Sequence, residues 1–176
     1  MVALFCYTSD MDTKLIILRG PSGAGKSTIA KKLRESSSRK IATVEQDMFR
    51  HSILHDQDGA RELSATMMKD AILSALGNGY DVIADGIFNL TYSKKMLDEI
   101  FENHKNNNFI YFFNISFDET VRRHAQRDKK NDFGAEEMRK WYTSASTSGY
   151  DFEKEITEDM SEDDVLREIL KNVEYI

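Results

Sequence analysis

The sequence predicts an α/β fold with a parallel β-sheet covered by helices on both faces. Short apolar runs alternate with segments of helical periodicity, and this alternation is typical of parallel strands joined by crossover helices. A glycine-rich phosphate-binding motif also lies between the first expected strand and the first expected helix. At 176 residues the chain suits one domain with a substantial core, so we expect a single domain over residues 1–176.

The first half of the chain alternates strand and helix. Residues 15–18 and 41–45 are short apolar runs that indicate strands, and residues 27–34 between them carry apolar side chains at helical spacing. Residues 61–76 indicate a longer helix that ends at a Gly-Asn-Gly turn. The next strand, residues 80–85, closes with an acid.

The second half continues the pattern. Residues 109–115 are almost continuously apolar, which suits a buried central strand, and residues 154–157 indicate a last short strand. Ser161 begins an acidic capping sequence that is typical of a helix start. The helices of this half are expected over residues 91–102, 118–127, 135–144 and from the cap to about residue 173.

Residues 20–28, Gly-Pro-Ser-Gly-Ala-Gly-Lys-Ser-Thr, fit the pattern G-x-x-x-x-G-K-[ST] at every fixed position. Glycines let such a loop turn tightly, so that successive N–H groups point inward at a helix N-terminus and bind phosphate. Lys26 is expected to reach the β- and γ-phosphates of ATP, and the Ser27 hydroxyl to hold Mg²⁺. The flanking strand and helix oppose the alternative of an ordinary glycine-rich turn. The expected nucleotide-binding residues are Gly20, Ser22, Gly23, Ala24, Gly25, Lys26, Ser27 and Thr28.

The composition limits the partners of the chain. A net charge of −6, from 24 basic and 30 acidic residues, opposes non-specific nucleic-acid binding and favours a small or locally recognised substrate. Cys6 is the only cysteine, which excludes an intramolecular disulfide. We expect a cytoplasmic protein without a membrane interaction, because the sequence contains no apolar run of about 18 residues. Residues 1–10 are interpreted as a flexible N-terminal extension or the result of an upstream start site, and the oligomeric state is not determined by the sequence.

Asp47 follows the second expected strand, at the edge of a parallel sheet where ligands gather. Its carboxylate is positioned to take a proton from an attacking hydroxyl, as a kinase for an alcohol requires. The alternative is an N-cap of a helical segment over residues 48–54, and the two roles are compatible. Arg50, three residues later, is a candidate for holding the acceptor or its phosphate.

Asp85 ends the third expected strand and precedes Gly86. A carboxylate at this place binds Mg²⁺ directly or through its water shell in phosphoryl-transfer sites. The alternative is a turn acid that accepts hydrogen bonds from loop N–H groups. Glu45 and Asp81 are weaker candidates for the same role.

Arg123 and Arg127 lie one turn apart on the same face of the expected basic helix. Such a face is suited to close over a triphosphate and to neutralise charge on the transferred group, because guanidinium groups donate paired hydrogen bonds to phosphate oxygens. The alternative is a solvated basic helix paired with neighbouring acids.

With these motifs in this order, the chain after Met11 resembles small P-loop kinases, in particular the group of chloramphenicol phosphotransferase, zeta-toxin kinases, gluconate and shikimate kinases, and polynucleotide kinase. The resemblance implies a five-stranded parallel sheet in the order 2-3-1-4-5 and a mobile lid over about residues 122–140. We expect an adenine pocket near residues 156–161, and the sequence does not determine whether it excludes guanine. The resemblance also implies that Asp47 is the base and that the lid arginines stabilise the transferring phosphoryl group. The basic residue that nucleoside monophosphate kinases carry shortly after the Asp85-Gly86 pair is absent.

The sequence therefore predicts an ATP- and Mg²⁺-dependent kinase that phosphorylates a hydroxyl of a small molecule such as a nucleoside, sugar or antibiotic. Lys26, Asp47, Arg123 and Arg127 are the expected catalytic residues. One alternative is a polynucleotide 5′-hydroxyl kinase, which the Asp47–Arg50 spacing favours and the acidic net charge opposes. Another is a non-catalytic, nucleotide-dependent switch.

Overall fold

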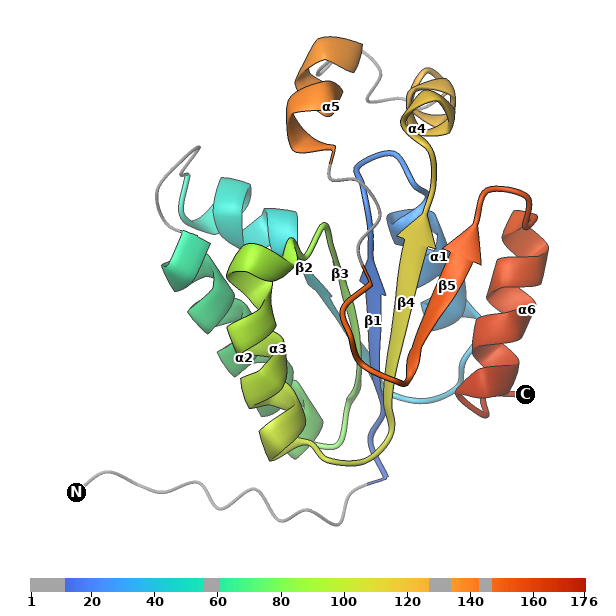
Figure 1. Ribbon diagram of the computed structural model, residues 1–176. Helices are drawn as coiled ribbons and strands as arrows, with labels where there is room; N and C mark the ends of the chain where they lie inside the picture. The colour runs from blue at the N-terminus through green and yellow to red at the C-terminus, as the bar shows by residue number, and fades with distance from the viewer. Residues whose placement is uncertain (1–11, 56–60, 127–133, 143–146) are drawn as a thin grey trace.

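The structure is a computed structural model that describes residues 12–55, 61–126, 134–142 and 147–176. Its centre is a five-stranded sheet in the order β2-β3-β1-β4-β5, and every neighbouring pair of strands is parallel (Figure 1). This confirms the predicted fold class and strand order. The strands are β1 (Leu15–Arg19), β2 (Ile41–Glu45), β3 (Asp81–Gly86), β4 (Asn108–Asn114) and β5 (Glu153–Thr157).

The helices follow the predicted pattern, with differences at two ends and one change of helix type. α4 ends at His124 rather than at residue 127, and α5 ends at Trp141 rather than at residue 144. The other predicted helices and strands agree with the structure to within one residue at each end. The helices are α1 (Lys26–Glu35), α2 (Arg61–Gly77), α3 (Leu90–Asn103), α4 (Phe117–His124), α5 (Ala135–Trp141) and α6 (Glu162–Asn172).

The segment after β2 is a π-helix, η1 (Met48–Ile53), rather than the expected α-helical turn. Its wider spacing is visible in the hydrogen bond from the backbone N–H of Leu54 to the carbonyl of Phe49, five residues earlier, at 3.1 Å. π-helical turns are rare in proteins, and those that occur often lie at functional sites.

Two helical layers cover the sheet, α1 and α6 on one face and α2 and α3 on the other (Figure 1). Successive side chains of a strand point to opposite faces, so β1 contributes to both cores. Ile16 and Leu18 pack with the α1–α6 layer, whereas Leu15 and Ile17 pack with the α2–α3 layer. Burial on both faces fixes the register of β1, and with it the start of the phosphate-binding loop.

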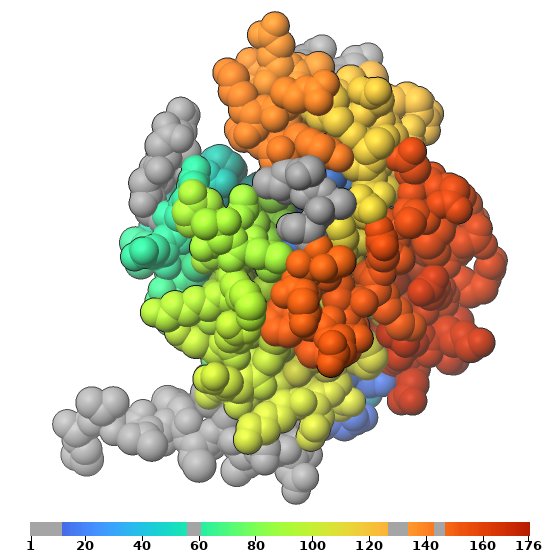
Figure 2. Space-filling model, in the orientation of Figure 1, coloured from blue at the N-terminus to red at the C-terminus, as the bar shows by residue number. Residues whose placement is uncertain are grey.

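The carboxyl ends of the strands meet at one edge of the sheet. Leu18 of β1 and Glu45 of β2 both lie opposite Asp85 of β3 in the strand register. The helices α4 and α5, called the lid from here on, form a cap above this edge (Figure 2). None of the described helices combines the length and apolar character that a bilayer crossing requires.

Candidate active site

The loop between β1 and α1 has the backbone of a phosphate cradle. Gly20, Gly23 and Gly25 have φ values of 145°, 84° and 100°, a region that side chains strongly disfavour. The loop also packs tightly against its neighbours. A Cβ on Gly20 would lie 2.7 Å from the carbonyl oxygen of Phe113, and one on Gly23 would lie 2.7 Å from that of Thr120 in the lid. Glycine is therefore required here for both conformation and space.

Lys26 and Ser27 begin α1, where backbone N–H groups and the helix dipole favour an anion. Lys26 is 7% exposed, and its Nζ donates a hydrogen bond to the carbonyl of Pro21 within the same loop at 2.9 Å. The ammonium group therefore lies against the loop that is predicted to bind the phosphates. Of the other predicted loop residues, Ala24 and Gly25 line the cavity described below, as does Thr28.

Ser27 and Asp85 meet across 58 residues of sequence. The Ser27 hydroxyl donates a hydrogen bond to Oδ2 of Asp85 at 2.5 Å, and Asp85 is 6% exposed at the end of β3. Hydroxyl and carboxylate oxygens are the ligands that Mg²⁺ prefers. The pair, beside a phosphate cradle, therefore fits the magnesium ion that the fold implies.

The weaker magnesium candidates lie elsewhere. Asp81 is at the opposite end of β3, where it forms an ion pair with Arg39, so assigning it to the magnesium site is wrong. Glu45 is exposed at the end of β2. A strand four residues long spans about 13 Å, so two acids on one strand need not share a site.

Asp47 and Arg50 lie at the start of η1, on the same edge of the sheet. The Asp47 side chain is 77% exposed, and its Oδ1 is 4.0 Å from Nε2 of His51. Asp47 occupies the N-cap position of η1, and its side chain makes no capping bond to the described η1 segment. Arg50 is half-buried one turn along η1.

A cavity of about 350 Å³ lies beside the phosphate cradle, between α1, β4, β5 and α6. Apolar side chains form much of its wall, and its polar groups include Arg123 and Gln126. A wall that combines apolar surface with polar groups that orient a ligand is typical of small-molecule sites. The wall residues are Gly23, Ala24, Gly25, Thr28, Ile29, Phe113, Arg123, Gln126, Ile156, Thr157, Met160, Glu162 and Val165. The cavity thus includes residues from the region where we expect an adenine pocket.

Arg123 connects the lid to the phosphate cradle. Its Nη1 donates to the carbonyl of Ala24 at 3.0 Å, and its Nη2 donates to the carbonyl of Glu158 at 3.4 Å. The guanidinium group therefore lies at the cavity wall, beside the loop. The predicted partner Arg127 falls outside the described residues.

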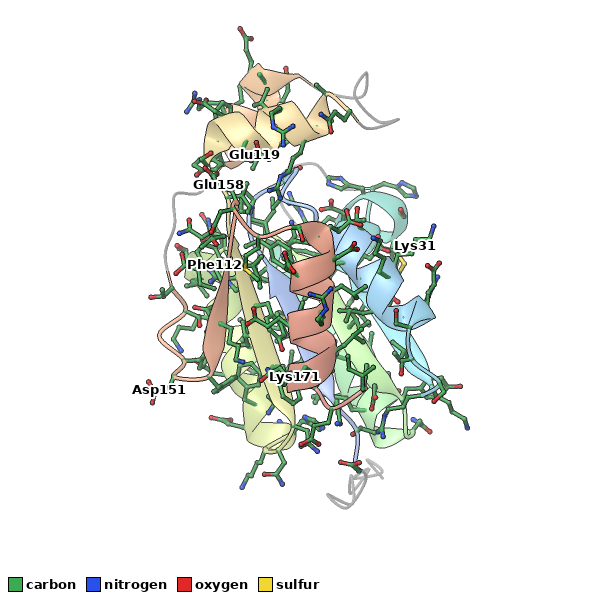
Figure 3. The ribbon with its side chains drawn as sticks, turned by 90° about the vertical axis from the view of Figure 1, so that its right-hand side faces the viewer. Lys31, Phe112, Glu119, Asp151, Glu158 and Lys171 are labelled. Atoms are coloured by element: carbon green, nitrogen blue, oxygen red, sulfur yellow. The ribbon has the colours of Figure 1, made fainter. Side chains whose placement is uncertain are left out.

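Glu119 holds this arginine in place from within α4. Its carboxylate accepts hydrogen bonds from Nε of Arg122 at 2.6 Å and from Nε of Arg123 at 2.7 Å. These two bonds lower the pKa of Glu119 to about 2, so its carboxylate is charged at neutral pH. Figure 3 shows Glu119 close to Glu158, where α4 meets the loop that follows β5.

Sequence reasoning missed Gln46 and the wall residue Phe113. Gln46 lies between Glu45 and Asp47, and its side-chain oxygen accepts hydrogen bonds from the backbone N–H groups of Ile87 and Phe88 at 3.0 and 3.3 Å. No local sequence pattern predicts a contact between two residues that are 41 positions apart. Phe113 reads as an ordinary core residue of an apolar strand, which it also is.

The fold and the site define a P-loop α/β protein, with a phosphate cradle, a strand-end acid and a lid along one sheet edge. The chain belongs to the AAA_33 family, described as an AAA domain, whose family model matches residues 15–150. A search of curated proteins finds no match.

Solved kinase structures share this fold. The APS kinase CysC of Mycobacterium tuberculosis, solved with AMPPNP and APS, superposes with a TM-score of 0.71 at 19% identity, covering 92% of this chain and 98% of that one. A gluconokinase from Sinorhizobium meliloti gives a TM-score of 0.67 at 15% identity, covering 93% of each chain. The Pnkp1/Rnl/Hen1 RNA repair complex contains a chain with a TM-score of 0.57 at 20% identity, covering 76% of this chain and 44% of that one. At these identities the likeness establishes the fold, and it agrees with the predicted resemblance to small P-loop kinases.

Proposed function

We propose that this protein is an ATP- and Mg²⁺-dependent kinase that transfers the γ-phosphoryl group to a hydroxyl of a small-molecule acceptor. The 2.5 Å contact between Ser27 and Asp85 beside the phosphate cradle carries the proposal. It brings the P-loop hydroxyl and a strand-end carboxylate together, as phosphoryl transfer from a magnesium nucleotide requires. The family and the fold of the solved kinases support the same class of reaction.

The nucleotide fits along the phosphate cradle with its base in the cavity. Ile29, Phe113 and Ile156 supply apolar surface for a planar ring, and Arg123 and Gln126 supply polar groups at the same wall. The loop N–H groups then receive the phosphates. Because the cradle and the cavity share Gly23, Ala24 and Gly25, one ligand can occupy both.

Lys26 and the Ser27–Asp85 pair serve the triphosphate. Lys26 exchanges its hydrogen bond to Pro21 for the β- and γ-phosphate oxygens, which places its charge beside the transferred group. Ser27 and Asp85 are the residues that would hold Mg²⁺. When bound, this ion neutralises phosphate charge and so favours departure of the ADP leaving group.

Asp47 is the proposed general base. Its exposed carboxylate accepts the proton of the acceptor hydroxyl while the acceptor oxygen forms a bond to the γ-phosphorus. The bond between the γ-phosphorus and the β–γ bridging oxygen breaks, and ADP leaves with that oxygen. Arg50 is proposed to hold the acceptor, and Arg123 and Arg127 of the lid region are proposed to stabilise charge on the transferred group.

A polynucleotide 5′-hydroxyl kinase is the second candidate. The Asp47–Arg50 spacing and the likeness to a chain of an RNA repair complex favour it. The net charge of −6 opposes it, because affinity for a polyanion depends largely on positive charge. A small acceptor therefore fits the composition better.

The test is transfer of labelled γ-phosphate from ATP to a panel of nucleosides, sugars, antibiotics and a 5′-hydroxyl oligonucleotide. Asp47→Asn should lower transfer by about 10²–10⁴-fold and leave the ATP dissociation constant within about twofold. Asp70→Asn, at an exposed acid on α2, is the matched control and should behave like the wild type. Tight ATP binding with no transfer to any acceptor would instead support a nucleotide-dependent switch.

A further inference from the structure

Gln46 forms hydrogen bonds with the loop that follows Asp85, the proposed magnesium ligand. Its Oε1 accepts from two successive backbone N–H groups, those of Ile87 and Phe88, at 3.0 and 3.3 Å. Successive N–H groups that converge on one point form a small anion-binding concavity, and here an amide oxygen fills it. The side chain of the β2–η1 junction is thereby attached to the β3–α3 loop, 41 residues further along the chain.

The attached loop has an unusual conformation. Phe88 is completely buried and has a φ of 44°, in the left-handed region that a bulky side chain rarely adopts. Gly86 leaves room for Gln46, because a Cβ on Gly86 would lie 2.7 Å from both Cβ and Oε1 of Gln46. Such backbone conformations persist only where the surroundings determine them, and they concentrate at functional sites. Gln46 is the side chain that supplies this constraint through hydrogen bonds.

Gln46 lies close in the chain or in space to two residues of the proposed reaction. Asp47, the next residue in the chain, is the proposed base for the acceptor. Asp85, which precedes Gly86, accepts the hydrogen bond from Ser27 and would serve Mg²⁺. The β3–α3 loop begins two residues after Asp85, and Gln46 joins this loop to the chain segment that carries Asp47.

We propose that Gln46 is a positioning residue that sets the place of Asp85 for the magnesium nucleotide by holding the N–H groups of Ile87 and Phe88. The proposal rests on the proposed function only in the magnesium role of Asp85. Groups that orient a metal ligand from behind generally change metal affinity or activity by about 10–100-fold when they are removed. Loss of the side-chain oxygen should therefore weaken the magnesium-dependent part of ATP binding rather than ATP binding as a whole.

The experiment compares two isosteric substitutions. Gln46→Glu keeps an oxygen acceptor at the same distance, whereas Gln46→Met keeps the length and lacks it. In the nucleotide-free protein, hydrogen exchange at the Ile87 and Phe88 amides should rise at least about tenfold in the Met variant and stay near the wild-type rate in the Glu variant. ATP affinity is then measured with Mg²⁺ and with EDTA. The ratio of the two affinities should fall about tenfold or more in the Met variant only.

Three results would overturn the proposal: unchanged exchange at the two amides in the Met variant, faster exchange with an unchanged magnesium ratio, or equal losses in the Glu and Met variants. The last two would reduce Gln46 to a structural residue. Should the Met variant fail to fold, Gln46→Asn, which is one methylene shorter, replaces it with the same expectations. A double-mutant cycle with Asp85→Asn adds a further requirement, because coupled residues should show less than additive losses in the magnesium ratio.

These readouts do not depend on phosphoryl transfer. If the wild type phosphorylates no acceptor and the amide and magnesium results hold, the proposed kinase activity fails and the role of Gln46 stands. If transfer is normal in the Met variant and the magnesium ratio is unchanged, the role of Gln46 fails and the kinase stands.

Discussion

The two ends of β3 each carry a buried acid, and the two acids have different surroundings. Asp81, at the amino end, is 1% exposed and accepts hydrogen bonds from Nε of Arg39 at 2.5 Å, the backbone N–H of Lys14 at 2.9 Å and the Tyr175 hydroxyl at 2.6 Å. Asp85, at the carboxyl end, is 6% exposed and accepts from the Ser27 hydroxyl of the phosphate cradle.

The difference separates an acid that builds the fold from an acid that we propose serves a ligand. Asp81 joins the start of β1, the loop before β2 and the C-terminal residues, and a guanidinium group balances its charge. A hydrogen bond to this carboxylate raises the pKa of Arg39. Burial, and after it the hydrogen bond to Asp81, raises the pKa of the Tyr175 hydroxyl. One partner of Asp85 is the neutral hydroxyl of Ser27. A carboxylate beside a phosphate-binding loop is suited to a cation, which is the role proposed for Asp85.

The largest effect should come from the carboxyl end, at Lys26. Lys26→Ala should lower kcat/KM by about 1000-fold, or about 4 kcal/mol of transition-state stabilisation, because its charge acts on the transferred phosphoryl group. The free energy of unfolding should fall by less than about 1 kcal/mol, since the bond from Lys26 to the Pro21 carbonyl is a single hydrogen bond within one loop. Kinetics and urea unfolding measure the two effects.

Lys31→Ala is the matched control for this prediction. Lys31 is on the same helix, its side chain is 69% exposed, and its Nζ is 4.0 Å from Glu35 (Figure 3). Its removal should change neither turnover nor stability appreciably. Near-normal turnover of Lys26→Ala would show that the mechanism proposed for the carboxyl end is wrong.

Asp81→Asn should have the opposite profile. The substitution removes the charge that balances Arg39 and leaves a buried group with weaker hydrogen bonds, so the free energy of unfolding should fall by about 2 kcal/mol. The folded fraction should keep its kcat/KM within about twofold, because the site lies at the far end of the sheet. Urea unfolding and initial rates at low temperature test both statements. A large loss of kcat/KM in the folded fraction would contradict the division between the two ends.

Sequence patterns predicted the fold well because interactions between nearby residues largely determine where strands and helices form. Apolar periodicity located the strands and most helix ends, and the motif over residues 20–28 located the phosphate cradle. The pairing of Ser27 with Asp85 was also predictable, because parallel strands place their carboxyl ends at one edge.

Long-range contacts account for what the patterns did not show. The bond from Arg123 to the Ala24 carbonyl spans 99 residues, and Gln46 reaches a loop 41 residues away. Neither contact leaves a periodicity or a motif in the sequence. The error over Asp81 has a different origin, because parallel pairing places the start of a strand at the opposite side of the sheet from the strand ends, and Asp81 is at a strand start.

The smallest effect is expected at Glu119, a partly exposed acid in the lid. Its pKa of about 2 in the folded protein lies below the ordinary unfolded value of about 4.3, so its contribution to stability is present above pH 5 and is lost as pH falls toward 2. Glu119→Gln should therefore lower the free energy of unfolding by about 0.5 kcal/mol between pH 5 and 8, and the difference from the wild type should vanish near pH 2. Urea unfolding at several pH values measures this difference, and Glu35→Gln, which removes the looser 4.0 Å pair with Lys31, provides the comparison. A difference that persists unchanged at pH 2 would mean that Glu119 stabilises the lid by packing rather than through its charge on Arg122 and Arg123.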